Sequence, residues 1–90
     1  MLDLSGKVVI VTGASRGIGR AVAVSLAARG AQVVAAARSD HAAATVREIE
    51  SAGGRADLVS VDVTDAASVA GMVGGAIERH GRIDVLVNNA

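Results

Sequence analysis

The stretch Lys7-Val-Val-Ile-Val-Thr12-Gly13-Ala-Ser15-Arg16-Gly17-Ile18-Gly19-Arg20 decides the fold. Its first half is apolar and β-branched, which is typical of a buried strand, and the periodicity after the glycines indicates a helix. We expect Gly13 to adopt a backbone angle that side chains disfavour, Gly17 to leave room for a phosphate, and Gly19 to let the helix pack closely on the strand. The free N–H groups at the start of the helix then predict an anion site.

The spacing of these glycines, Gly-x-x-x-Gly-x-Gly, is weak evidence alone and gains weight from the strand before it and the helix after it. An ordinary glycine-rich turn is the alternative interpretation. The phosphate loop of the Walker type is excluded, because no Gly-Lys-Ser/Thr follows the turn.

The rest of the chain alternates between strand-type and helix-type segments. Helices are expected over about residues 17–29, 40–52 and 65–80, and strands over residues 7–12, 31–37, 56–61 and 83–87. This βαβαβαβ order with apolar strands predicts an α/β fold of Rossmann type. Its doubly wound parallel sheet would have the strand order 3-2-1-4 and be truncated after the fourth strand. The ligand crevice is expected between the carboxyl ends of the first and fourth strands.

Apolar periodicity also predicts the buried face of each helix. These faces are Ile18, Ala21, Val22, Ser25 and Leu26 in the first helix, Ala42, Val46 and Ile49 in the second, and Val69, Met72, Val73, Ala76 and Ile77 in the third. Gly71, Gly74 and Gly75 lie inside the third helix and indicate either close packing or a weak helix.

Polar residues before two of the helices are candidate caps. Ser39 or Asp40 is expected to cap the second helix, and Thr64 or Asp65 the third, because short polar side chains accept hydrogen bonds from the free N–H groups of the first turn.

Composition narrows the classes of partner. Nine basic and nine acidic residues give no formal net charge, which argues against a general nucleic-acid or anionic-membrane partner. The chain has no cysteine, and His41 and His80 are far apart, so no metal site is expected and both histidines are interpreted as non-catalytic surface residues. No apolar run approaches the ~20 residues of a membrane span and the start lacks signal-peptide features, so a cytoplasmic protein is expected.

Two arginines flank the expected crevice. Many dinucleotide-binding folds carry Asp or Glu at the end of the second strand to bind the ribose hydroxyls, and here that position is Ala37. Arg38 follows directly, and Arg16 lies inside the glycine turn. Two guanidinium groups without a carboxylate suit a 2′-phosphate, which predicts NADP rather than NAD as the cofactor. The alternative is that both arginines are only solvated at the surface.

Polar residues elsewhere at this edge are further candidates. Asp62 closes the third strand, where its carboxylate could accept a hydrogen bond from an adenine amino group and the N–H of Val63 could donate to a ring nitrogen. By chemistry alone, a helix-capping role for Asp62 is an equal alternative. Ser15 offers its hydroxyl either to a phosphate or to the turn itself, and Thr12 is expected to pair within the sheet.

The segment from Thr12 to Gly19 resembles the signature Thr-Gly-x-x-x-Gly-x-Gly of the classical short-chain dehydrogenases/reductases, and nearly the whole chain fits the amino-terminal half of that family. The resemblance implies that Asp62-Val63 holds the adenine. It also implies that Asn88-Asn89-Ala90 corresponds to an Asn-Asn-Ala-Gly motif whose backbone lines the adenosine ribose. The candidate cofactor-binding residues are Gly13, Ser15, Arg16, Gly17, Ile18, Gly19, Arg38, Asp62, Val63, Asn89 and Ala90.

The resemblance also implies an activity, which is hydride transfer between a nicotinamide dinucleotide and a small-molecule carbonyl or alcohol substrate. The family's Tyr-x-x-x-Lys pair lies beyond the Asn-Asn-Ala-Gly motif, and this chain has no tyrosine and a single lysine, Lys7. Residues 1–90 are therefore expected to form an incomplete NADP-binding half-domain, without catalytic residues, of a longer homo-oligomeric reductase. The lead-in Leu4-Ser-Gly-Lys7 is most similar to the 3-oxoacyl-[acyl-carrier-protein] reductase branch.

Two other functions are alternatives. One is a non-catalytic NADP-binding module or sensor, which the missing tyrosine favours. The other is a methyltransferase, whose glycine loop also follows the first strand. Ala37-Arg38 argues against the methyltransferase, because that class needs an acid after the second strand.

Overall fold

The computed structural model describes residues 3–89, which fold into seven alternating strands and helices. In chain order these are β1 (Val8–Thr12), α1 (Gly17–Ala28), β2 (Gln32–Ala37), α2 (Ala43–Ser51), β3 (Arg55–Ser60), α3 (Ala66–His80) and β4 (Val85–Val87). The predicted order βαβαβαβ is confirmed. Each described helix is too short or too polar to traverse a lipid bilayer.

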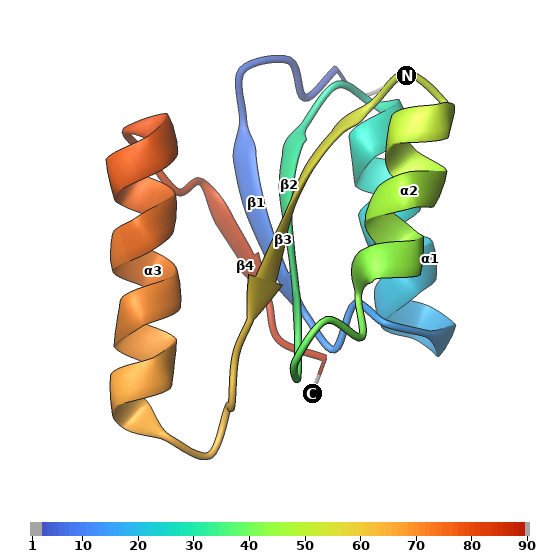
Figure 1. The fold of residues 1–90 in the computed structure, drawn as a ribbon. Helices are drawn as coiled ribbons and strands as arrows, with labels where there is room; N and C mark the ends of the chain where they lie inside the picture. The colour runs from blue at the N-terminus through green and yellow to red at the C-terminus, as the bar shows by residue number, and fades with distance from the viewer. Residues whose placement is uncertain (1–2, 90) are drawn as a thin grey trace.

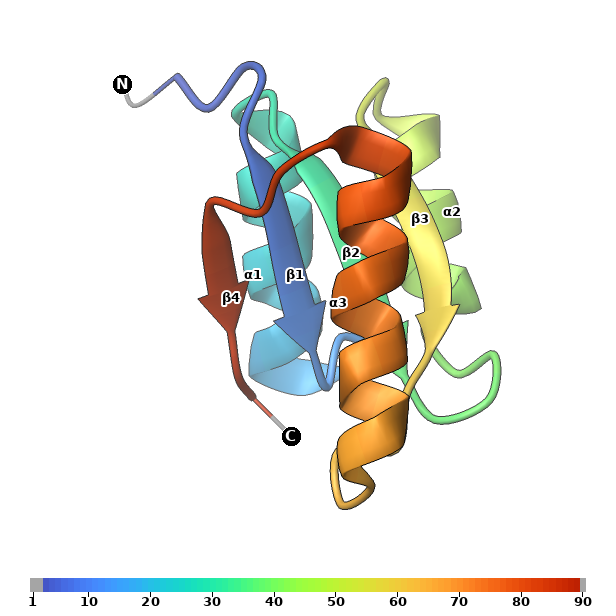
Figure 2. The same cartoon turned by 90° about the vertical axis from the view of Figure 1, so that its left-hand side faces the viewer.

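The four strands form one parallel sheet in the order β3-β2-β1-β4, as predicted. Figure 1 shows the sheet between two helical layers, with α1 and α2 covering one face and α3 the other. Figure 2 shows β4 at the edge of the sheet, beside β1. The doubly wound α/β arrangement follows from the crossover that each parallel pair requires.

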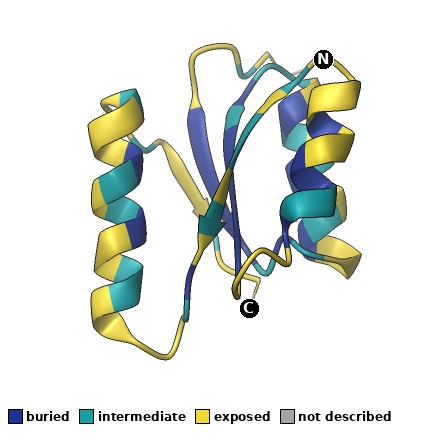
Figure 3. Ribbon diagram, in the orientation of Figure 1, coloured by how far each residue is buried: buried dark blue, intermediate teal, exposed yellow. Residues whose placement is uncertain are grey.

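The central strands β1 and β2 are buried along nearly their whole length, because both of their faces are covered (Figure 3). Val9 and Val11 belong to the apolar cluster under α1 and α2, whereas Val8 and Ile10 belong to the cluster under α3. This two-sided burial explains why the strands are continuous apolar runs rather than alternating ones.

The buried face of α1 differs from the prediction. Gly19, Ala23 and Ala27 face the sheet, whereas Ile18 is 74% exposed. The helix lies too close to β1 for larger side chains, since a Cβ on Gly19 would lie 2.0 Å from the carbonyl oxygen of Gly13. The larger apolar side chains predicted to be buried line a shallow hollow beside the helix, where Val22 and Leu26 are only partly buried and Leu26 also packs against the core.

The other two helices follow their periodicity more closely. Ala42, Val46 and Ile49 are buried at α2, as predicted. Met72 and Ala76 are buried at α3 with Val69 and Val73 packed beside them. Ile77 is 49% exposed, so its predicted burial is wrong for the residues that the structure describes.

Of the two helix caps predicted from the sequence, the structure confirms one, at α3, and contradicts the other, at α2. Asp65 caps α3 and accepts a hydrogen bond from Ala67 N at 2.9 Å, which is one of the two predicted possibilities. Neither Ser39 nor Asp40 caps α2, because the helix starts later, after Ala42, which has no side chain able to accept.

The glycines within α3 are weak helix positions rather than packing contacts. No heavy atom outside the local helix backbone lies within 4 Å of a Cβ built on Gly71 or Gly74. Gly75 would meet only the guanidinium of Arg79. The alternative of close packing is therefore wrong at these positions.

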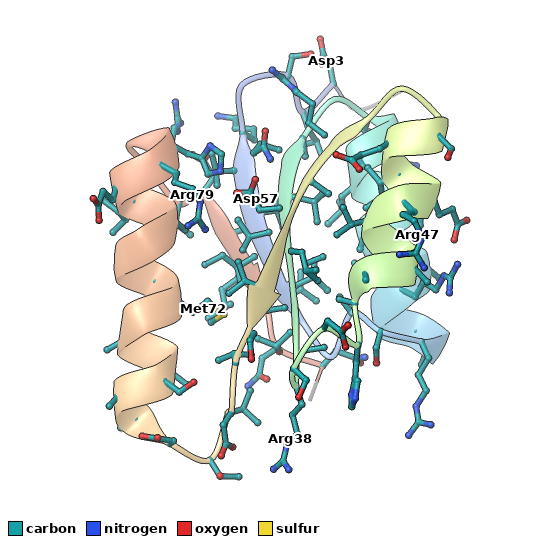
Figure 4. The ribbon with its side chains drawn as sticks, in the orientation of Figure 1. Asp3, Arg38, Arg47, Asp57, Met72 and Arg79 are labelled. Carbon is teal, nitrogen blue, oxygen red and sulfur yellow. The ribbon has the colours of Figure 1, made fainter. Side chains whose placement is uncertain are left out.

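His80 is half-buried rather than a plain surface residue. Its Nε2 lies 2.5 Å from Oδ2 of Asp57 on β3, and Arg79 Nε lies 3.3 Å from the same oxygen (Figure 4). This cluster ties the last turn of α3 to the sheet.

Candidate cofactor site

The glycine turn connects β1 to α1 at the carboxyl end of the sheet. Gly13 has φ +64° and Gly17 has φ +59°, a region that disfavours residues with a Cβ. Apart from its chain neighbours and the local helix backbone, no described heavy atom lies within 4 Å of a Cβ built on Gly17, whereas Gly19 has no room for one. The expected geometry is confirmed for all three glycines: an unusual backbone angle, an open approach and a close helix-to-strand contact.

The amino terminus of α1 is left open by its own side chains. Its N-cap residue Arg16 is extended and makes no side-chain capping bond, and no acidic residue occupies the first turn. In α3, by contrast, Asp65 fills this role. The N–H groups at the start of α1 therefore have no side-chain cap among the described residues, and with the positive end of the helix dipole they can bind an anion.

Two neighbouring hollows meet at the glycine turn. One of about 210 Å³ is lined by Gly13, Ser15, Ala37, Arg38, His41, Val61 and Val63. The other, of about 390 Å³, is lined by Gly13, Ser15, Arg16, Gly17, Ile18 and Asn89. They share Gly13 and Ser15, so Arg38 and Arg16 lie on the two sides of one turn rather than in a single pocket.

Arg38 extends from the carboxyl end of β2 and is 70% exposed at its side chain (Figure 4). Its Nη2 lies 3.6 Å from Oδ1 of Asp62, and both groups are solvated, so the pair is weak and exchangeable. Asp62 Oδ1 also accepts hydrogen bonds from Thr64, at 2.6 Å from the hydroxyl and 3.0 Å from the amide. These bonds lower the pKa of the Asp62 carboxyl, and the nearby Arg38 charge contributes less.

The segment after β4 is fastened to the end of β1 through Thr12. The Thr12 hydroxyl donates to Asn88 Oδ1 and accepts from the Asn89 N–H, both at 3.1 Å. Asn89 also lines the second hollow. Ala90, which the sequence places in the site, lies outside the described residues.

Two residues at the site were not predicted. The Thr45 hydroxyl donates to the carbonyl of Ala14 inside the glycine turn at 2.7 Å. His41 lines the first hollow because a turn, closed by His41 N to Arg38 O at 3.0 Å, places it beside Arg38, with Ser39 at φ +51°. Thr45 could have been found, since it lies on the same predicted helix face as Ala42 and Ile49.

The described residues offer no metal centre. No group of three or more His, Cys, Asp or Glu residues is placed to hold an ion within residues 3–89. The donor set consists of backbone amides, a hydroxyl and guanidinium groups, which suits phosphate oxygens.

Comparisons with known proteins agree with this geometry. A family model described as short chain dehydrogenase matches residues 7–90. An uncharacterized oxidoreductase of Methylorubrum extorquens is 49% identical over 100% of this chain and 37% of its own length. The 3-oxoacyl-[acyl-carrier-protein] reductase of Escherichia coli is 43% identical over 99% of this chain and 36% of its own.

A solved structure shows the same likeness in three dimensions. A metagenomic short-chain oxidoreductase in complex with NADP matches with a TM-score of 0.93 and 49% identity, over 97% of this chain and 40% of that one. The present chain spans little more than a third of the length of the curated relatives. Because the family model covers nearly all of it, the chain belongs to the short-chain dehydrogenase family.

Proposed function

We propose that residues 1–90 are the NADP-binding part of an oxidoreductase that transfers hydride between nicotinamide and a carbonyl or alcohol substrate. One observation carries the proposal: the open glycine turn and uncapped α1 are flanked by two guanidinium groups, with Ala37 where an NAD-type site has a carboxylate. Membership of the short-chain dehydrogenase family supports it and removes the methyltransferase alternative.

In this proposal the amides from Gly13 to Gly19 hold the pyrophosphate, with Ser15 beside it. Arg16 and Arg38 bind the 2′-phosphate from the two sides of the turn. The loose pair between Arg38 and Asp62 gives way, because a phosphate is a stronger partner for a guanidinium than a solvated carboxylate 3.6 Å away.

The adenine would then lie toward Val63 in the first hollow and contact the neighbouring Asp62, and Asn89 with Ala90 would line the adenosine ribose. Bound nicotinamide would supply or accept the hydride. The residues of this chain would only bind and orient the cofactor. They cannot supply the family's Tyr-x-x-x-Lys pair, because the 90 residues contain no tyrosine and Lys7 lies before β1, at the end of the sheet away from the hollows.

We further propose a 3-oxoacyl thioester as the substrate class, on the strength of the resemblance and of the Escherichia coli relative. The second candidate function is a non-catalytic NADP-binding module, which the absence of tyrosine from these residues favours. The coding sequence that follows residue 90 separates the two, because the first function needs a Tyr-x-x-x-Lys pair there and a binding module does not.

The cofactor assignment is tested by calorimetric titration of NADPH and NADH into the wild type, Arg38→Asp and Arg47→Asp. A charge-assisted hydrogen bond contributes about 1.5–3 kcal/mol, so Arg38→Asp should reduce the preference for NADPH by about tenfold to a hundredfold. Arg47 is exposed on α2 and lines neither hollow, so its matched charge reversal should leave the preference unchanged (Figure 4). An unchanged preference in Arg38→Asp contradicts the proposal.

A further inference from the structure

The hydroxyl of Thr45 connects helix α2 to the middle of the glycine turn. Its Oγ1 donates to the carbonyl oxygen of Ala14 at 2.7 Å, and both residues are 0% exposed. The N–H of the same Ala14 donates to the Ala36 carbonyl of β2 at 3.1 Å. Both backbone polar groups of Ala14 are therefore held by elements outside the turn.

The direction of the Ala14 carbonyl determines the direction of the next N–H. In a trans peptide, the C=O of one residue and the N–H of the following residue point in opposite directions in one plane. No cis peptide bond occurs within residues 3–89, so a carbonyl aimed inward at Thr45 aims the Ser15 N–H away from α2. Ser15 lines both hollows, and its N–H has no hydrogen-bond acceptor among residues 3–89.

The turn needs such an outside restraint. Gly13 and Gly17 border it, and glycine restricts its own backbone less than any other residue. A buried hydrogen bond to a fixed helix removes this freedom at the Ala14–Ser15 peptide. Without this bond the buried Ala14 carbonyl would have neither water nor a hydrogen-bond donor, which is energetically unfavourable. The Thr45 hydroxyl is therefore held in its bond to this carbonyl.

We propose that Thr45 is a positioning residue, which holds the Ala14–Ser15 peptide so that the Ser15 N–H faces a bound phosphate. The inference depends on the proposed function, since it concerns the same dinucleotide. The role of Thr45 differs from those of Arg16 and Arg38. Thr45 would affect binding of the pyrophosphate, which NADP and NAD share, whereas the two arginines would bind the 2′-phosphate, which only NADP has.

The test compares Thr45→Val, which is nearly isosteric and removes the hydroxyl, with Thr45→Ser, which keeps it. Calorimetric dissociation constants for NADPH and NADH are measured at a temperature where circular dichroism shows each variant folded. A neutral hydrogen bond contributes about 0.5–1.5 kcal/mol, so Thr45→Val should bind both dinucleotides about 2- to 10-fold more weakly, with their ratio unchanged. Thr45→Ser should bind like the wild type.

Val46→Ala is the matched control, because Val46 is the next residue of α2, is buried and has no bond to the turn. It should lower the melting temperature without changing either dissociation constant. Equal weakening of binding by Val46→Ala and Thr45→Val would overturn the inference, since general loosening would then explain both. If Thr45→Val does not fold, Thr45→Cys makes the same comparison, because a thiol is a weak donor of similar size.

The two proposals fail in different ways. A wild type that binds neither dinucleotide would overturn the proposed function, and this inference with it. A wild type that binds both, and a folded Thr45→Val that binds them equally well, would overturn only the role of Thr45. A change in the NADPH to NADH ratio in Thr45→Val would also overturn it, because the shared pyrophosphate contact cannot discriminate between them.

Discussion

Replacing Gly19 by alanine tests the close contact on which the site is built. A Cβ at this position would lie 2.0 Å from the Gly13 carbonyl oxygen and 2.8 Å from Asn89 Nδ2. Carbon atoms in favourable contact lie about 3.5–4.0 Å apart, so α1 and the turn would have to separate by more than about 1 Å. Overpacking costs about 1–3 kcal/mol, and we expect the upper end, because the obstructing oxygen belongs to the backbone.

At 3 kcal/mol, a chain of this size should lose roughly 12–24 °C in melting temperature. The chain has no aromatic residue to report unfolding by fluorescence, so far-ultraviolet circular dichroism is the suitable assay. Because the displaced turn carries the amides of the proposed pyrophosphate site, Gly19→Ala should also weaken calorimetric binding of NADPH and NADH, including below its melting temperature.

Gly71→Ala is the matched control with the opposite expected sign. It makes the same chemical change in α3, where no heavy atom outside the local helix backbone lies within 4 Å. Alanine is better than glycine inside a helix by about 0.8–1.0 kcal/mol, which should raise the melting temperature by roughly 4–8 °C. A destabilisation of about 1 kcal/mol should lower the melting temperature by roughly 4–8 °C. If Gly19→Ala melted within about 2 °C of the wild type, it would therefore cost less than about 1 kcal/mol, and the close-contact argument would be refuted.

Three further substitutions test contacts of the fold and the burial of two side chains. Asp84 accepts bonds from Val8 N and from Arg82, the latter bond being the main cause of its lowered pKa. It therefore stabilises the fold above its ordinary pKa of 3.8. In melts at different pH, the advantage of the wild type over Asp84→Asn should be full above about pH 5 and shrink on further acidification, and a constant difference would contradict this. Ile49 is 1% exposed, so Ile49→Ala should cost about 2–5 kcal/mol in denaturant titration, and a loss below about 1 kcal/mol would mean that it is not in the core. Ile18→Ser should change stability by less than about 0.5 kcal/mol in the same titration, because the side chain lies outside the core, and a larger loss would restore the face predicted from sequence.

The features that sequence predicted are those set by neighbouring residues. The glycine turn, with its run of β-branched residues before and its periodic run after, encodes strand, turn and helix within fourteen residues. Asp65 as a cap follows from the reach of a short carboxylate to an amide two residues later. The strand order then follows from the crossovers that parallel strands require and from the family resemblance, which is confirmed.

The features that sequence did not predict depend on partners far along the chain. Thr45 and Ala14 are 31 residues apart, and His80 and Asp57 are 23 apart. Periodicity can place a polar residue on the inner face of a helix, but it does not identify the hydrogen-bond partner of that residue on another element. The α2 cap failed for a related reason: the turn that brings His41 beside Arg38 delays the start of the helix past both candidate residues.

Helix α1 shows why hydrophobic periodicity alone can select the wrong face. One stripe, within residues 18–26, carries the larger aliphatic side chains, and another consists of Gly19, Ala23 and Ala27. Larger side chains gain more from burial only where the backbones stand far enough apart to hold them. Here the tight turn that bares the first amides of α1 also starts the helix against the Gly13 carbonyl, where only a hydrogen atom fits. The tight turn therefore selects the stripe of small residues for the core and leaves the aliphatic stripe exposed at Ile18 and only partly buried at Val22 and Leu26.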